Sequence, residues 1–304
     1  MLDGGVHFLA LSLAHRAVRT APHLHIPRPA HPPVPPLQPP LQMLSSSSAL
    51  RVSRRLLSTS STSAWQPHYG AWIHGKEFLN PSLASYAIED PARRQTLCTV
   101  QDADSATVDL AVASGRAAFK SGVWSRMDVR DRAEILHESA RALRLRVPEF
   151  AHTESMQTGR AIREMNAQLG RLPEWLEYFA AVIRTHEGTV PPFKGNYVNY
   201  VKRVPLGVCA QITPWNHPML IAIKKIAPAL AAGNSIVVKP SEFAPITVLE
   251  FAKLMTECGL PDGVFNCVAG QGECGAALAK HSDLDMVDLT GGTPTGKKVR
   301  KNTQ

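Results

Sequence analysis

The second half of the chain alternates short apolar runs with stretches of helical pattern, and this alternation restricts the fold more than any other feature. The expected strands are 208–213, 236–238, 264–268 and 286–290. The expected helices are 220–232, 246–258 and 273–281, and a last helix follows the turn at 291–296. Near-continuous apolar strands between helices are typical of βαβ units in a parallel sheet that is covered on both faces. We therefore expect an α/β fold.

The region before this alternation is expected to be a hairpin followed by helices. Residues 71–78 place apolar side chains on both sides of a turn at His74–Lys76, which predicts a β-hairpin. Residues 105–184 have helical patterns, with Gly159 at a helix C-terminus. Residues 197–204 alternate and are rich in Tyr and Val, which predicts a strand. One helical face is marked by apolar repeats: Leu136, Ala140, Leu143 and Val147.

Most of the excess positive charge lies in residues 1–64. The chain carries a net charge of +8, and residues 1–64 contribute +5 of it through six arginines against one acid. The remainder has a net charge of +3, which gives no basis for nucleic-acid binding. Nine prolines in the nineteen residues 22–40 predict an extended tether, with a Pro-rich ligand as the less favoured alternative.

The segment that begins at Met43 has the composition of a targeting peptide. It is rich in Ser, free of acids, and places Arg51, Arg54 and Arg55 on one arc of a helix opposite apolar residues. This pattern predicts a mitochondrial transit peptide, so we expect residues 1–64 to be a disordered leader. The alternative is a disordered basic tail on a cytoplasmic protein. Met43 is an alternative start, in which case 1–42 would be an over-extended gene prediction.

The sequence shows no signature of a metal site, a disulfide framework or a membrane span. Its five cysteines are odd in number and form no CxxC pair, and its histidines form no HExxH or HxxxH pair. We predict reduced, mostly buried thiols and no bound metal. The longest early apolar stretch, 6–14, is too short to cross a bilayer.

Ligands of open parallel sheets bind beyond the carboxyl ends of the strands, so the loops there are the candidate sites. In 213–218, two prolines would hold Asn216 as a fixed amide donor for an oxyanion, or would simply build a turn. In 239–242, Lys239 would leave the strand with its charge free. Glu242 would accept ribose hydroxyls and repel a 2′-phosphate, although an ordinary solvated Lys–Glu pair is the alternative.

The third loop, 291–296, is glycine-rich and lies between a strand and a helix. Such glycines allow the backbone to approach a pyrophosphate at a helix N-terminus, or they form a structural tight turn. The second Gly, Gly296, is followed by Lys297–Lys298. The segment therefore lacks the Lys-Ser/Thr pair of a P-loop, which argues against ATP binding.

Taken together, these motifs resemble the aldehyde dehydrogenase superfamily over roughly residues 68–298. The resemblance rests on 203–208, 213–218, 224–234, 239–242 and 289–296, and extends to 154–160. It implies a Rossmann-like parallel sheet flanked by helices, a cofactor-binding domain with a β-hairpin at its start. It also implies oxidation of an aldehyde to a carboxylic acid with NAD as cofactor, NADP being disfavoured by Glu242.

The resemblance assigns roles residue by residue. Asn216 would be the oxyanion donor. Gly292 stands where the family usually has a Ser that bonds the pyrophosphate, and His217 stands where Phe is common. The remaining cofactor-binding positions would be Ile212, Thr213, Pro214 and Trp215 in the cleft, Lys239, Ser241 and Glu242 at the ribose, Gly272 and Gly275 in a turn beside the adenine, and Thr290, Gly291 and Gly296 near the pyrophosphate.

The family's nucleophilic cysteine adds to the aldehyde, and its glutamate base activates the water that hydrolyses the thioester. Both belong to segments after the 289–292 motif, in ELGGK-like and GQxC contexts that do not occur here. Cys274 lies in a GQxxC context before that motif, and we interpret it as a residue of a helix. The adjacent Glu273 is not expected to replace the glutamate base. We therefore expect residues 65–304 to be an incomplete cofactor-binding domain without the catalytic domain, and the chain to be inactive alone.

The sequence leaves other readings open. The chain could be a non-catalytic NAD-binding or subunit-pairing fragment of a full-length paralogue, or an incomplete gene prediction. The family forms homo-oligomers, and its aldehyde cannot be read from these residues. The helix expected at 163–183, with Trp175, Tyr178 and Phe179, would be either a wall of the substrate tunnel or a plain core stripe.

Overall fold

A six-stranded sheet forms the centre of the molecule in the computed structural model, which describes residues 66–303. Its strand order is β3-β2-β8-β7-β6-β9. The pairs β6–β7, β6–β9 and β7–β8 are parallel. The predictions for the leader, 1–64, lie outside the described residues. The bounds are β2 Ala71–Ile73, β3 Lys76–Phe78, β6 Val208–Ile212, β7 Ser235–Lys239, β8 Phe265–Cys267 and β9 Met286–Leu289.

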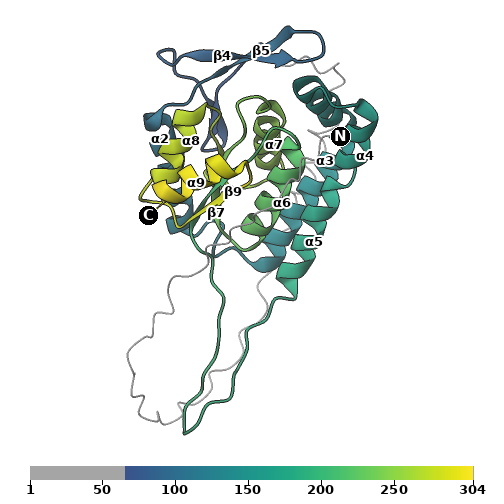
Figure 1. Ribbon diagram of the computed structural model, residues 1–304. Helices are drawn as coiled ribbons and strands as arrows, with labels where there is room; N and C mark the ends of the chain where they lie inside the picture. The colour runs from purple at the N-terminus through teal and green to yellow at the C-terminus, as the bar shows by residue number, and fades with distance from the viewer. Residues whose placement is uncertain (1–65, 304) are drawn as a thin grey trace, which may run out of the picture. The chain divides into compact units, whose positions relative to one another are not determined.

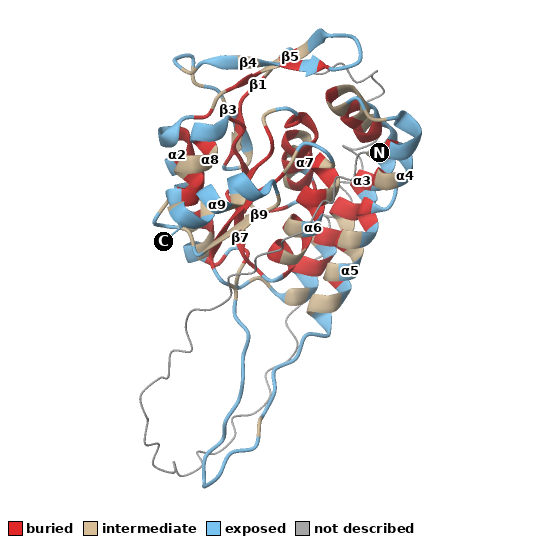
Figure 2. Ribbon diagram, viewed as in Figure 1, coloured by how far each residue is buried: buried red, intermediate tan, exposed pale blue. Residues whose placement is uncertain are grey.

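Helices cover both faces of this sheet, as the alternating pattern predicts. Each expected strand and helix of the second half is present, with bounds shifted by one or two residues, except that the last helix begins at Thr293, inside the expected turn at 291–296. Every residue of β6 and β7 is buried, because neither face of these strands meets solvent (Figure 2). The connecting helices are α6 Pro218–Ala231, α7 Ile246–Glu257, α8 Gly272–Lys280 and α9 Thr293–Asn302. The expected α/β fold with a Rossmann-like parallel sheet is confirmed.

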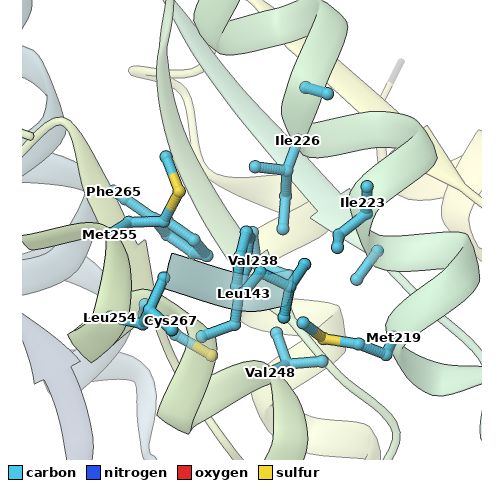
Figure 3. Packing of buried hydrophobic residues seen from close by; sticks show 14 of the residues in the cluster. Leu143, Met219, Ile223, Ile226, Val238, Val248, Leu254, Met255, Phe265 and Cys267 are labelled. Atoms are coloured by element: carbon cyan, nitrogen blue, oxygen red, sulfur yellow. The ribbon is translucent and has the colours of Figure 1, made fainter. Parts of the chain in front are cut away.

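Two hydrophobic clusters lie on the opposite faces of the sheet. The larger joins α6 and α7 to α3 (Val129–Thr158), and Figure 3 shows Leu143 of α3 beside Met219, Ile223 and Val248. The smaller joins α2 (Ser105–Ser121) and α8 to the other face. This arrangement explains why Val237 and Val238, adjacent in β7, belong to different clusters.

The predicted hairpin is confirmed and extends the sheet at one edge. Strand β2 pairs antiparallel with β3, and Trp72 of β2 pairs with Cys267 of β8. The two turn residues, His74 and Gly75, have φ values of 53° and 70°. Such positive φ values match the right-handed twist of two-residue hairpins, and Gly adopts them without steric cost. The central sheet is therefore parallel with an antiparallel edge.

A second sheet, of three strands, is absent from the sequence-based expectations. Its order is β1-β5-β4, with β1 His68–Tyr69, β4 Ser85–Asp90 and β5 Gln95–Gln101. Strand β4 has only two buried residues, Ile88 and Asp90, so its apolar signal is weak. Asp90 accepts the amides of Ala92 and Arg93 at the turn between β4 and β5.

The helices before the sheet agree with the sequence except at one break. Helix α3 ends at Gly159, which has a φ of 72°, as predicted. The single helix expected at 163–183 is wrong, because it is interrupted at Gly170 and Arg171 to form α4 (Ile162–Leu169) and α5 (Leu172–Arg184). Trp175 and Phe179 of α5 pack on the larger cluster, as a core stripe does. Within residues 66–303, none of the helices has the length and apolarity needed to cross a membrane.

Residues 185–206, which we call the arm, connect α5 to the sheet without forming a helix or strand (Figure 1). The strand expected at 197–204 is therefore wrong. The two limbs of the arm meet in one bridge, with Val201 N donating to Thr189 O at 2.7 Å and Thr189 N to Val201 O at 3.3 Å. Apolar residues along the arm are exposed to solvent: Val190, Phe193, Tyr197, Val198, Tyr200, Val201, Val204 and Leu206.

Candidate functional site

The loops after β6, β7 and β9 meet at one edge of the sheet, where the sequence places the candidate residues. Backbone hydrogen bonds extend beyond the strands there. Thr213 N donates to Lys239 O at 3.1 Å, and Thr290 N donates to Ile212 O at 3.0 Å. The structure therefore brings the ends of the three strands that precede these loops into direct contact. Ile212, Thr213, Lys239 and Ser241 are all buried at this edge.

The loop after β7 holds a paired lysine and glutamate. Lys239 Nζ donates to Pro240 O at 3.1 Å and lies 3.7 Å from Glu242 Oε2. Ser241 Oγ donates to the same carboxylate oxygen at 3.3 Å. The expectation that Lys239 leaves the strand with its charge free is wrong, because a buried ammonium needs a partner. Glu242 remains partly exposed and keeps acceptor capacity for a ligand.

The loop after β6 presents its side chains outward over a fixed backbone. Pro214 is half-buried, whereas Trp215 and Asn216 are exposed, Trp215 by 54%. Arg160, just after α3, donates Nη1 to Asn216 O at 3.3 Å. The loop is thus anchored through the main chain of Asn216, which leaves its side-chain amide facing solvent as a donor. An exposed amide on an anchored backbone is compatible with the role of oxyanion donor predicted for Asn216.

His217 fixes the same loop to α4. Arg160 Nη1 lies 3.1 Å from His217 Nε2, and the Gln168 amide faces Nδ1, with its Nε2 at 2.8 Å and its Oε1 at 3.2 Å. A guanidinium can only donate, so Nε2 accepts and Nδ1 carries the proton toward Gln168. Burial lowers the pKa of His217, and the charges of Arg160 and Lys224 lower it further. A neutral imidazole at this position can hydrogen-bond, which a Phe ring cannot. It joins the start of α6 to Gln168 of α4.

One buried hydroxyl at the strand ends has no partner in the protein. Thr213 Oγ1 is inaccessible to solvent and makes no hydrogen bond with any described residue. Thr290 N donates to Ile212 O, so the end of β9 lies next to the end of β6. Gly291 and Gly292, which follow Thr290, are exposed, and Cβ atoms there would approach protein no closer than 3.6 Å. The Thr213 hydroxyl therefore keeps unused hydrogen-bonding capacity at this edge of the sheet.

The glycines of the last two motifs lie mostly in helices. Gly272 is the first residue of α8 and Gly275 lies in its first turn, so they do not form a separate turn as expected. A Cβ on Gly275 would lie 3.4 Å from Lys239 Cδ, so this glycine lets α8 approach the lysine stem. Gly292 caps α9, and Gly296 lies inside that helix rather than in the preceding turn.

All five cysteines are buried and unsuited to nucleophilic attack. Burial raises the pKa of the Cys98, Cys209 and Cys258 thiols to about 12, and it raises that of Cys267 further. Cys274 is 1% exposed, and burial raises its pKa to about 11 despite the nearby Lys239. Its position within α8 agrees with the reading as a helix residue. Thiolates are the reactive form, so none of these groups is activated.

Three residues that position the site were not singled out from the sequence. Arg160 and Gln168 hold the loop after β6, as described above. Asp102, just after β5, accepts Gln271 N at 2.9 Å and Gln271 Nε2 at 2.9 Å at the start of α8. No local pattern marks these contacts, because each joins elements at least 49 residues apart. Among residues 66–303, no group of three or more His, Cys, Asp or Glu could hold a metal ion.

The solved structures that this chain resembles include several aldehyde dehydrogenases. The chain is 35% identical to a γ-glutamyl-γ-aminobutyraldehyde dehydrogenase from Burkholderia cenocepacia, with a TM-score of 0.76, covering 83% of this chain and 50% of that one. It is 33% identical to an aldehyde dehydrogenase from Bacillus cereus solved with NAD+, with a TM-score of 0.75 and coverage of 78% and 48%.

A third relative is the betaine aldehyde dehydrogenase of Staphylococcus aureus in complex with NAD+, which is 32% identical, with a TM-score of 0.75 and coverage of 77% and 48%. The chain thus spans about half the length of these relatives. The aldehyde dehydrogenase family pattern matches residues 78–304, which is most of the chain and contains every candidate site residue. The chain therefore belongs to the aldehyde dehydrogenase family.

Proposed function

We propose that this chain binds NAD at the carboxyl ends of β6, β7 and β9. The observation that carries the proposal is the joining of Thr213, Lys239 and Thr290 at one sheet edge by backbone hydrogen bonds. Ligands of open α/β sheets bind at such edges, where the strand order reverses. Here the order β8-β7-β6-β9 reverses at β6. Two of the structural relatives contain NAD+.

The residues at this edge fit the cofactor's chemistry. Glu242 would accept the adenosine ribose hydroxyls, and Lys239 would hold that carboxylate in place from 3.7 Å. A 2′-phosphate would meet the Glu242 carboxylate, which disfavours NADP. Thr213 Oγ1, orphaned in the protein, would gain a partner. The amides at the N-terminus of α9, behind Gly292, suit a pyrophosphate.

Calorimetric titration of the purified chain with NAD and with NADP tests this proposal. We expect saturable NAD binding and weaker NADP binding. Glu242→Gln should weaken NAD binding and narrow the difference between the two cofactors, because it removes both the charged acceptor and the repulsion. Glu187→Gln is the matched control, since Glu187 is an exposed acid on the arm. The absence of any saturable NAD binding would overturn the proposal.

The activity we propose for the complete catalytic unit is oxidation of an aldehyde to a carboxylic acid, with NAD accepting hydride. In that unit, the Asn216 side chain would donate to the developing oxyanion. The anchoring of Asn216 O by Arg160 holds the donor before substrate arrives. Asn216→Ala in the complete unit should lower kcat more than it changes the Kd for NAD. An equal loss in both would assign Asn216 to cofactor binding instead.

We propose further that residues 1–304 do not turn over aldehydes by themselves. Each thiol of this polypeptide is buried and protonated at neutral pH, so it offers no nucleophile for a covalent intermediate. The expected result is no steady NADH production from purified 1–304 with aliphatic or aromatic aldehydes. Steady production that survives further purification would contradict the proposal.

A second candidate function, pairing with other subunits, is favoured by the arm. Its apolar residues are exposed, and its backbone makes only one bridge within the described chain. We propose that the arm pairs this chain with further copies of itself, as in a homo-oligomer, or with a full-length paralogue. Light scattering across a dilution series should show association that Tyr197→Ser and Val198→Ser weaken. A strictly monomeric wild type, with and without the paralogue, would exclude this function.

We also propose a mitochondrial location, on the composition of residues 43–61 alone. Import into isolated mitochondria of a reporter carrying residues 43–64 tests it. The matched control replaces Arg51, Arg54 and Arg55 by Gln. The replacement should abolish import, and failure of the unaltered reporter to be imported would favour the cytoplasmic alternative.

A further inference from the structure

Helices α6 and α7 begin directly after the two loops that carry most of the candidate cofactor residues. Neither helix is capped by its own sequence. The N-cap residues, His217 and Pro245, make no side-chain hydrogen bond to the first turn. The first amides of a helix lack partners within it and need acceptors from elsewhere when buried. The first turns of α6 and α7 are buried, so these acceptors must come from another element.

Helix α3 supplies them through Glu154 and Gln157. The Glu154 carboxylate accepts Met219 N of α6 at 3.1 Å. Gln157 Oε1 accepts Ile246 N of α7 at 3.1 Å. Three residues apart on α3, the two side chains share one helix face, so one turn of α3 caps both helices. Glu154 is fully buried and Gln157 is 3% exposed.

Thr247 closes these contacts into one network. Its hydroxyl donates to Glu154 Oε2 at 2.7 Å and accepts from Gln157 Nε2 at 2.9 Å. Each of the three side chains thus has a partner within the network, which is the condition under which a buried polar group fixes geometry. Below the network, Met219 and Val248 point into the core shared with α3 (Figure 3). The contacts tie the C-terminal turns of α3 to the starts of α6 and α7.

We infer that Glu154 and Gln157 are positioning residues for the cofactor site, because they fix the spacing between the loops 213–217 and 240–245. The ionised form of Glu154 also complements the positive end of the α6 dipole. Just beyond the C-terminus of α3, Arg160 holds Asn216 O, so residues 154–160 set both the base and the tip of the loop. The inference rests on the proposed binding of NAD.

Two near-isosteric variants test this inference. Glu154→Gln keeps the shape but removes the charged acceptor, and Gln157→Met removes the contacts to α7. Both variants should raise the Kd for NAD by about tenfold, the effect of losing a hydrogen bond to a buried group. Binding is measured well below each variant's Tm, so that a loss of stability alone leaves the Kd unchanged.

Ser139→Ala is the matched control. Ser139 is a fully buried hydroxyl on the same helix that bonds Ile135 O in the preceding turn, far from α6 and α7 starts. Its variant should lower the Tm without changing the Kd for NAD. If Glu154→Gln and Gln157→Met fold and bind NAD within about twofold of the wild type, the inference is overturned.

Hydrogen exchange separates this inference from the proposed function. In the absence of NAD, Glu154→Gln should accelerate amide exchange in peptides covering 217–222, and Gln157→Met in those covering 244–249. Unchanged exchange in both would overturn the positioning role. If the wild type does not bind NAD while exchange responds as expected, the proposed function fails and the capping role of the pair stands.

Discussion

Strand β7 and the arm are built from similar residues and reach opposite outcomes. Strand β7 is Ser-Ile-Val-Val-Lys, every residue buried between β6 and β8. The arm segment 197–204 is rich in Tyr and Val, yet Val198 is 83% exposed and only Val201 makes a backbone bridge. The difference shows that β-branched and aromatic residues make a strand only where a neighbouring strand satisfies the backbone.

The largest contrast between the two regions should appear on truncating an aromatic ring. Phe265 of β8 is 2% exposed and packs edge-to-face on Phe251, with ring centroids 6.2 Å apart. Phe265→Ala should lower the free energy of unfolding by about 3–5 kcal/mol, because the buried ring leaves a cavity. Urea denaturation followed by circular dichroism measures the loss. A loss below about 1 kcal/mol would mean that the site collapses around the missing ring.

A pH-dependent effect of similar size should come from Glu154. Burial raises the pKa of Glu154 from 4.5 to about 7 despite the hydrogen bonds from Thr247 and Met219 and the charge of Arg160. The folded protein therefore binds this proton more tightly than the unfolded chain, and stability falls as pH rises between those values. Relative to Glu154→Gln, the wild type should lose on the order of 3 kcal/mol between about pH 4.5 and 8. A constant difference across this range would show that the carboxyl titrates normally.

A smaller effect is expected where the arm joins the sheet. Asn234 Oδ1 accepts Leu206 N at 2.7 Å and Gly207 N at 3.1 Å, and its side chain is buried. Asn234→Ala should lower the free energy of unfolding by about 1–3 kcal/mol, because it orphans buried amides. Asn199→Ala, on the exposed arm, is the control and should change it little. Equal losses of unfolding free energy for Asn234→Ala and Asn199→Ala would contradict the contrast between the buried sheet and the exposed arm.

The smallest effect on stability should come from the arm itself. Tyr200 is 71% exposed. Tyr200→Ala in dilute, monomeric protein should change the free energy of unfolding by less than about 0.5 kcal/mol. A loss comparable to that of Phe265→Ala would show that the arm folds onto the described chain in solution.

The sequence predicts the half of the fold in which burial on both sides imposes continuous apolar runs. The strands around Val208 and Val238 and the intervening helices follow from that pattern. It misses β4, because Ser85–Asp90 carries only two buried residues, and it misreads the arm, whose strand pattern has no partner in the described chain. The site follows the same division. Lys239 and Glu242 are found by their place after a strand, whereas Arg160 and Asp102 act across the fold and leave no local pattern.

Caps supplied from outside a helix have a consequence for modularity. The first amides of α6 and α7 depend on Glu154 and Gln157, and the start of α8 depends on Asp102. All three acceptors of these caps precede residue 185 in the chain, although the loops they hold follow residue 208. A recombinant cut just before β6 would therefore remove the supports while retaining the loops. The smallest segment that contains both the cofactor loops and their supports therefore begins before Asp102, not at β6.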